Sequence, residues 1–269
     1  MSKCISCNQE FQKIGDAQEF EIYQCKNCGL GKTKGSEINY GNYHRDEVYI
    51  KEDSQFENIF QKRVGIILKF KKNGLVLDIG SSTGTMLSLF AQKGWEVQGI
   101  EPSKNSSQQA LKKGIPTLNT FFEKAKLENN KYDVVIANHV LEHIDDPVGF
   151  LEKIYKILKK GGIVLIDAPN FGSFSARTFG TKWQYLLPRE HLWHFSSKSL
   201  ASLLRKSGFS IVYKETHSGV WGYGNPFKEL LQSLFGFKKR FFINFISSIP
   251  AWYVSKLGLG TGLTIVAKK

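Results

Sequence analysis

One segment constrains the fold more than any other. Between Leu75 and Lys93 an apolar run, a turn with two glycines and a helix-forming run follow one another directly. A buried strand that passes through a tight turn into a helix is typical of a βαβ unit. Gly80 and Gly84 have no Cβ atom, so the turn can adopt unusual dihedral angles and lie close against a bound molecule. Asp78 is at the carboxyl end of the strand, where open α/β sheets bind ligands. We therefore expect a ligand site at this turn.

An acidic residue follows at the end of the next predicted strand. Residues 96–100 form that strand, and Glu101 ends it, about 20 residues after the glycine turn. A carboxylate there can accept hydrogen bonds from both hydroxyl groups of a ribose. The alternative is a charge stabilised near a helix N-terminus, since Ser103 suits the N-cap of a helix running to Gly114. The spacing favours the ribose.

Strands and helices continue to alternate through the rest of the chain. Residues 132–138 and 161–167 are apolar runs typical of buried strands, and the segment between them has the apolar spacing of an amphipathic helix. Residues 209–213 and 262–267 indicate two last strands, antiparallel at the edge of the sheet. This order predicts an α/β fold with a doubly wound, mostly parallel sheet.

Five blocks of sequence, in order, resemble a known family. They are DIGSSTG at 78–84, Glu101, NHVLEH at 138–143 with DP at 146–147, LPREHL at 187–192 with FS at 195–196, and last Leu200, Leu203, Leu204, Gly208 and Phe209. Together they resemble class I S-adenosylmethionine-dependent methyltransferases, in the branch that methylates small molecules, sugars and lipid-linked intermediates. The resemblance covers residues 56–269 and implies a seven-stranded, Rossmann-like sheet. The family often has glycine where this chain has Ser82.

The resemblance also implies roles for individual residues of the cofactor site. S-adenosylmethionine would be held at its methionine end by Asp78, Gly80, Ser81 and Gly84, and at its ribose by Glu101. Asn138 would line the pocket near the sulfonium.

Two histidines follow Asn138 in the same block. His139 and His143 lie beside the expected pocket. For His143 we expect a structural role, with its ring bonded to a backbone carbonyl.

All four cysteines of the chain lie in its first 28 residues, as two C-x-x-C pairs. Cys4, Cys7, Cys25 and Cys28 have the spacing of a four-thiolate zinc ribbon, which we place at residues 1–35. Such a site leaves no open coordination position, so this zinc is expected to be structural. Between the pairs, residues 11–14 and 19–23 are predicted to form a hairpin around Gly15 and Asp16. Two disulfides are the alternative, disfavoured in a cytosolic chain.

Two aromatic segments are candidates for substrate contact. Residues 36–55 form a polar, tyrosine-rich linker, and Tyr43 is our choice for a lid over the cofactor, as in many members of the resembled family. Residues 168–188 follow the fifth strand, at the edge where substrates are held. Within it Trp183 is predicted to contact a sugar ring or an isoprenoid chain. For both segments, packing against the domain is the alternative.

Methyl transfer to a hydroxyl group needs a base, because a hydroxyl is a poor nucleophile. His191 is the candidate, since a neutral imidazole accepts protons near pH 7, and Glu190 could orient it. A loop-fixing hydrogen bond is the alternative role for His191. The sequence thus predicts O-methylation of a small molecule, sugar or lipid-linked glycan intermediate.

A hydrophobic insertion at about 220–258 separates the two last strands. Lys238, Lys239 and Arg240 precede an uncharged run that is too short to cross a bilayer and contains Pro250. Aromatic residues beside a basic triplet suit an element lying on an anionic membrane surface, so residues 238–257 are a candidate for peripheral contact. Packing against the domain is the alternative.

Charge and composition limit the partners without naming one. A net charge of +13 attracts phosphates of any kind, but the lysines are scattered. An RNA methyltransferase is less favoured, because the fourth strand is not followed by an Asn-Pro-Pro-aromatic motif and the ribbon uses every cysteine, which leaves none to act as a nucleophile.

A non-catalytic adaptor is disfavoured by the intact cofactor motif. The start of the sequence has no apolar run, so we expect a cytoplasmic protein.

Overall fold

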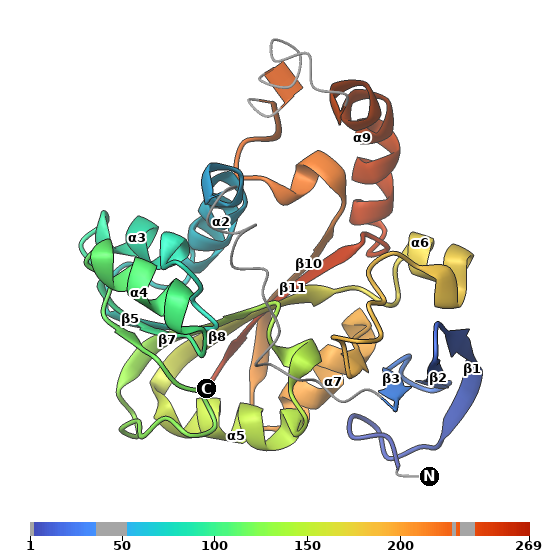
Figure 1. Ribbon diagram of the computed structural model, residues 1–269, viewed down its shortest axis with the longest axis horizontal. Helices are drawn as coiled ribbons and strands as arrows, with labels where there is room; N and C mark the ends of the chain where they lie inside the picture. The colour runs from blue at the N-terminus through green and yellow to red at the C-terminus, as the bar shows by residue number, and fades with distance from the viewer. Residues whose placement is uncertain (1–2, 36–52, 228–229, 232–239) are drawn as a thin grey trace.

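The computed structural model describes residues 3–35, 53–227, 230–231 and 240–269 (Figure 1). Its centre is a seven-stranded sheet in the order β10-β11-β8-β7-β4-β5-β6. The five strands from β8 to β6 are parallel, whereas β11 is antiparallel to both β8 and β10. Their bounds are Leu75–Ile79 (β4), Glu96–Ile100 (β5), Thr117–Leu118 (β6), Tyr132–Asn138 (β7), Leu158–Pro169 (β8), Ser210–His217 (β10) and Gly262–Lys268 (β11). This confirms the doubly wound, mostly parallel sheet predicted from the sequence.

Helices cover both faces of this sheet (Figure 1). One face packs against α2 (Asp53–Ile67), α3 (Thr85–Ala91) and α4 (Lys104–Lys112), and the other against α5 (Pro147–Ile157) and α7 (Ser197–Lys206). Neighbouring residues of β4 show the two layers, since Val76 packs into the first core and Leu77 into the second. Burial on both faces explains why the parallel strands are nearly continuous apolar runs.

The N-terminal region forms a second, four-stranded antiparallel sheet. Its strands are β1 (Phe11–Ala17), β2 (Phe20–Cys25), β3 (Gly31–Lys34) and β9 (Trp193–His194). The hairpin expected between the cysteine pairs is present, but its predicted turn is wrong. Gly15 and Asp16 lie inside β1, where the register shifts at Gly15, and the chain reverses at Gln18, which has a φ of 53°.

This second sheet is joined to the main domain by backbone pairing and by a shared core. β3 pairs with β9, which follows β8 by more than twenty residues. Cys4, Cys25 and Cys28 belong to the same apolar cluster as α5 and α7. The Oγ atom of Ser196 donates to the Cys28 carbonyl at 2.7 Å. Residues 3–34 therefore pack as an integral layer beside α6 (Phe174–Phe179) and α7 (Figure 1).

The insertion before the last strand contains η4 (Gly219–Gly222) and α9 (Arg240–Lys256), with Pro250 inside the helix. Trp221 donates its indole N–H to the carbonyl of Ser248 at 2.8 Å, which ties α9 to η4. No helix within the described residues is long and apolar enough to cross a membrane. Lys238 and Lys239 lie outside the described residues.

Candidate functional site

The glycine turn between β4 and α3 has the left-handed backbone that its sequence predicts. Gly80, Ser82 and Gly84 have φ angles of 72°, 48° and 75°. A Cβ atom on Gly80 would lie 2.8 Å from Cγ2 of Val140, so the turn lies directly against the segment that follows β7. The left-handed backbone at Ser82 is a conformation that glycine adopts more readily than serine.

Three of the predicted cofactor residues have buried polar atoms without a hydrogen-bond partner among the described residues. These atoms are Oδ1 of Asp78, Oγ of Ser81 and Oδ1 of Asn138. Burial, and then the nearby Glu101 carboxylate, raise the pKa of Asp78 well above its usual value. Buried polar atoms without partners are rare in folded proteins. They fit a polar ligand, and the ammonium group of S-adenosylmethionine would offset the negative charge around Asp78.

Glu101 lies at the end of β5, as predicted, but its carboxylate also binds the backbone. Oε2 accepts from the N–H of Ser82 at 2.9 Å, and Oε1 accepts from the N–H of Ser103 at 2.8 Å. Ser103 caps α4 with its side chain. Each carboxylate oxygen can accept more than one hydrogen bond. Glu101 can therefore hold the glycine turn and still receive ribose hydroxyl groups.

His139 is the first residue after β7 and lies beside the turn. Its φ of 54° is unusual for a residue with a side chain, and 46% of its side chain is exposed. Its Nδ1 atom is 3.1 Å from Oε1 of Glu142, a side chain that is only 1% exposed. Strained backbone next to a ligand site is a common feature of functional residues.

Glu142 and the two remaining histidines of this region form a buried cluster. Burial raises the pKa of Glu142, but its hydrogen bond with His139 and the charge of that ring outweigh burial and lower the pKa to about 2. His143 donates from Nδ1 to the Glu190 carbonyl at 2.7 Å, which confirms the expected bond to a backbone carbonyl. The ring of His191 packs edge-on against that of His143.

The predicted base, His191, is in the interior. It is 5% exposed, and burial lowers its pKa to about 4. Its Nδ1 atom donates to the Tyr185 carbonyl at 3.2 Å, so the ring is oriented by the backbone. Glu190 contributes its carbonyl to this cluster, as the acceptor of the His143 bond.

Sequence reasoning missed a buried ion pair at the carboxyl end of β8. Nε of Arg63 on α2 lies 2.7 Å from Oδ2 of Asp167, which also accepts a hydrogen bond from Thr264. Arg63 donates as well to the carbonyl of Gly222 and contacts His217. The pair therefore joins α2, β8 and the insertion. The sequence did contain a signal for Asp167, since it is an acidic residue at the end of a strand, as Asp78 and Glu101 are.

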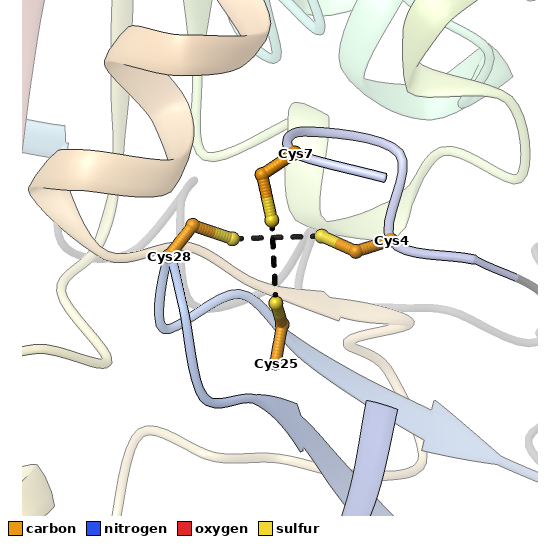
Figure 2. Close-up of side chains that lie close together, drawn as sticks. All are labelled: Cys4, Cys7, Cys25 and Cys28. Carbon is orange, nitrogen blue, oxygen red and sulfur yellow. Dashed lines mark hydrogen bonds between the residues drawn. The ribbon is translucent and has the colours of Figure 1, made fainter. Parts of the chain in front are cut away.

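The four cysteines converge on one point (Figure 2). Sγ of Cys4 is 3.5 Å from that of Cys28, and Sγ of Cys7 is 3.4 Å from that of Cys25. A tetrahedral zinc ion with bonds of about 2.3 Å separates its sulfur ligands by about 3.8 Å, so the geometry fits zinc. Burial raises the pKa of Cys4 and of Cys28, and a bound cation would remove their protons.

Only one of the two predicted substrate residues lies in the part of the chain that the structure describes. Tyr43 lies outside the described residues. Trp183 is 3% exposed and packs with Phe20, Ile22 and Phe171, while its indole N–H donates to Ser175. This position favours packing between the N-terminal sheet and α6 over substrate contact.

Comparison with known proteins gives one family. A family model described as a methyltransferase domain matches residues 53–214. A ubiquinone biosynthesis O-methyltransferase of Cereibacter sphaeroides is 29% identical over 151 residues, which are 51% of this chain and 60% of that protein. The C-methyltransferase NovU of Streptomyces niveus is 23% identical over 71% of this chain and 47% of its own length. This chain thus spans about half to three fifths of these two relatives.

Solved structures show the same fold. A SAM-dependent methyltransferase of Thermotoga maritima, described as a possible histamine N-methyltransferase, aligns with a TM-score of 0.53 at 21% identity. The alignment covers 83% of this chain and 97% of the other.

Proposed function

The chain belongs to the family of methyltransferase domains, and from that premise we propose that it transfers the methyl group of S-adenosylmethionine to an oxygen atom of a small molecule, a sugar or a lipid-linked glycan intermediate. The observation that carries the proposal is the set of buried atoms on Asp78, Ser81 and Asn138 around the glycine turn, none of which has a partner in the described part of the chain. A small-molecule acceptor agrees with the relatives, which are named for ubiquinone biosynthesis and for C-methylation.

Binding and alignment account for most of the chemistry that the chain itself must supply. When bound, S-adenosylmethionine supplies an activated methyl group on a cationic sulfonium. The glycine turn and Glu101 would fix the cofactor, and the edge formed by the ends of β7 and β8 would orient the acceptor oxygen in line with the methyl carbon. Transfer to an oxygen atom would release the acceptor proton, which a base of this chain would have to take.

The geometry favours His139 over His191 as that base. The side chain of His139 is 46% exposed at the edge of the sheet, whereas His191 is 5% exposed and its low pKa makes it a weak proton acceptor. Glu142 accepts the Nδ1 proton of His139, which leaves Nε2 to take the acceptor proton. We therefore assign proton removal to His139, positioned by Glu142, and a positioning role to His191.

Labelled cofactor tests the function and identifies the acceptor. The protein is incubated with methyl-deuterated S-adenosylmethionine and a small-molecule extract of its source cells, and mass spectrometry finds the product that gains the label. A product labelled on oxygen supports the proposal, and a product labelled on carbon or nitrogen, or an unlabelled extract, contradicts it. With that acceptor, His139→Gln should lower turnover by roughly 100- to 10,000-fold. His191→Gln should change it less; the reverse order would restore His191 as the base.

The exposed face of α9 favours a peripheral contact with membranes, which suits a lipid-linked acceptor. Ile246, Ile249 and Tyr253 are between 60% and 78% exposed, and their spacing places them on one side of the helix. This proposal concerns where the enzyme meets its substrate and leaves the chemistry unchanged.

A further inference from the structure

Glu142, His143 and His191 come from two separate segments and meet in the interior. One ligand atom from each of the three lies within 4.8 Å of the other two. Glu142 and His143 belong to η2 (Leu141–His143), and His191 precedes β9. Glu142 is 1% exposed and His191 is 5% exposed. His143 is half-buried, so the cluster lies just beneath the surface, and it is distinct from the four-cysteine site.

The hydrogen bonds of the two rings fix their tautomers. A backbone carbonyl can only accept, so Nδ1 must carry the hydrogen both in His143, bonded to the Glu190 carbonyl, and in His191, bonded to the Tyr185 carbonyl. In the neutral ring the lone pair is then on Nε2. Histidines that bind metals have this same arrangement, in which the second ring nitrogen donates to a carbonyl or a carboxylate.

The carboxylate of the cluster has an oxygen available. Oε1 of Glu142 is bonded to His139, but Oε2 is buried and has no hydrogen-bond partner among the described residues. A buried carboxylate oxygen without a partner is unfavourable unless a cation neutralises it.

We propose that Glu142, His143 and His191 bind a divalent transition-metal ion, with Zn²⁺ as the first candidate. Two imidazoles and one carboxylate are ligands that Zn²⁺ binds at about 2.0–2.2 Å, so small side-chain shifts would close the site. Three protein ligands leave a coordination position for water or for a substrate oxygen. The proposal does not depend on the identity of the methyl acceptor.

Metal content measures this site separately from the zinc ribbon. The full-length protein is equilibrated with Zn²⁺, passed through a desalting column and measured by elemental analysis. We expect two ions per chain in the wild type, and one in Cys25→Ser, in His191→Gln and in Glu142→Gln. His217→Gln is the matched control, because His217 is also buried beside charged groups but contacts Arg63 and Asp167 instead. It should keep two ions.

Cobalt substitution keeps the test decisive if a variant loses structure. Co²⁺ bound by four thiolates gives strong sulfur-to-metal charge-transfer absorption, which a site of two nitrogens and one oxygen lacks. His191→Gln should therefore keep the thiolate band, which shows that the N-terminal sheet is folded, and lose only the second equivalent of Co²⁺. One ion per chain in the wild type, or two ions that survive both His191→Gln and Glu142→Gln, would overturn the proposal.

Discussion

The carboxylate of Glu101 contacts both the backbone of the glycine turn and the start of α4. Glu101→Gln removes its charge and one acceptor oxygen, and should weaken S-adenosylmethionine binding by about 1.5–3 kcal/mol, typical of hydrogen bonds to a charged group. Calorimetry measures the change. Ser103→Ala is the control, because it removes the cap of α4 and keeps the carboxylate. Equal affinities in wild type and Glu101→Gln would argue against ribose binding by Glu101.

The buried ring of His194 should make the stability of the fold depend on pH. Its ring is 3% exposed, Nε2 lies 2.8 Å from Oγ1 of Thr33, and burial lowers its pKa to about 3. The pKa of His194 in the folded protein is below its value of about 6.5 in the unfolded chain. The neutral ring therefore stabilises the folded state fully above pH 6.5. This stabilisation is lost as the pH falls from there toward 3, since the unfolded chain takes up the proton first.

Urea unfolding between pH 5 and pH 8 tests this residue. The contribution of His194 to the free energy of unfolding should fall by up to about 1.4 kcal/mol for each pH unit below 6.5. His194→Gln, which can still bond to Thr33, should flatten that slope. A variant whose pH dependence matches the wild type would show that other groups cause the acid sensitivity.

At the scale of elements, we expect the N-terminal sheet to depend on a bound zinc ion for folding. Zinc binding contributes about 10–16 kcal/mol in small zinc-finger peptides, far more than a segment of this size gains from its core. Removing zinc with a chelator, or Cys25→Ser, should therefore unfold β1 to β3. Since β9 and α7 contact this sheet, hydrogen exchange should speed up there as well. Unchanged exchange in the metal-free protein would contradict a structural zinc, and adding zinc back is the control.

The exposed face of α9 gives a second prediction at this scale. Ile249 is 78% exposed, so Ile249→Glu should leave the fold intact while it weakens binding to anionic phosphatidylglycerol vesicles. Binding should also fall as salt rises, because charges are screened within about 8 Å at physiological ionic strength. Neutral vesicles are the control in a sedimentation assay. If the wild type fails to sediment with anionic vesicles at low salt, the exposed face of α9 does not bind membranes.

At the scale of the whole molecule, the sequence predicted the strands and turns that depend on local sequence pattern. The strand Tyr132–Asn138 and the glycine turn were predictable because burial and chain reversal leave periodic signals. The two-residue strand Trp193–His194 was not, because it forms only by pairing with β3. The pairing of Arg63 with Asp167, and the meeting of His191 with Glu142, likewise depend on segments far apart in the chain.

Pairing between β3 and β9 also has a consequence for biosynthesis. Thr33 and His194, which bond across this pair, are 161 residues apart. At a translation rate of about 5–20 residues per second, the ribosome needs roughly 8–32 s to make the intervening chain. During that interval the cysteine-bearing segment has emerged without its fourth strand, so its thiols are open to oxidation and to foreign metals. Early capture of zinc would protect them, and zinc supply during translation, more than afterwards, would then set the yield of native enzyme.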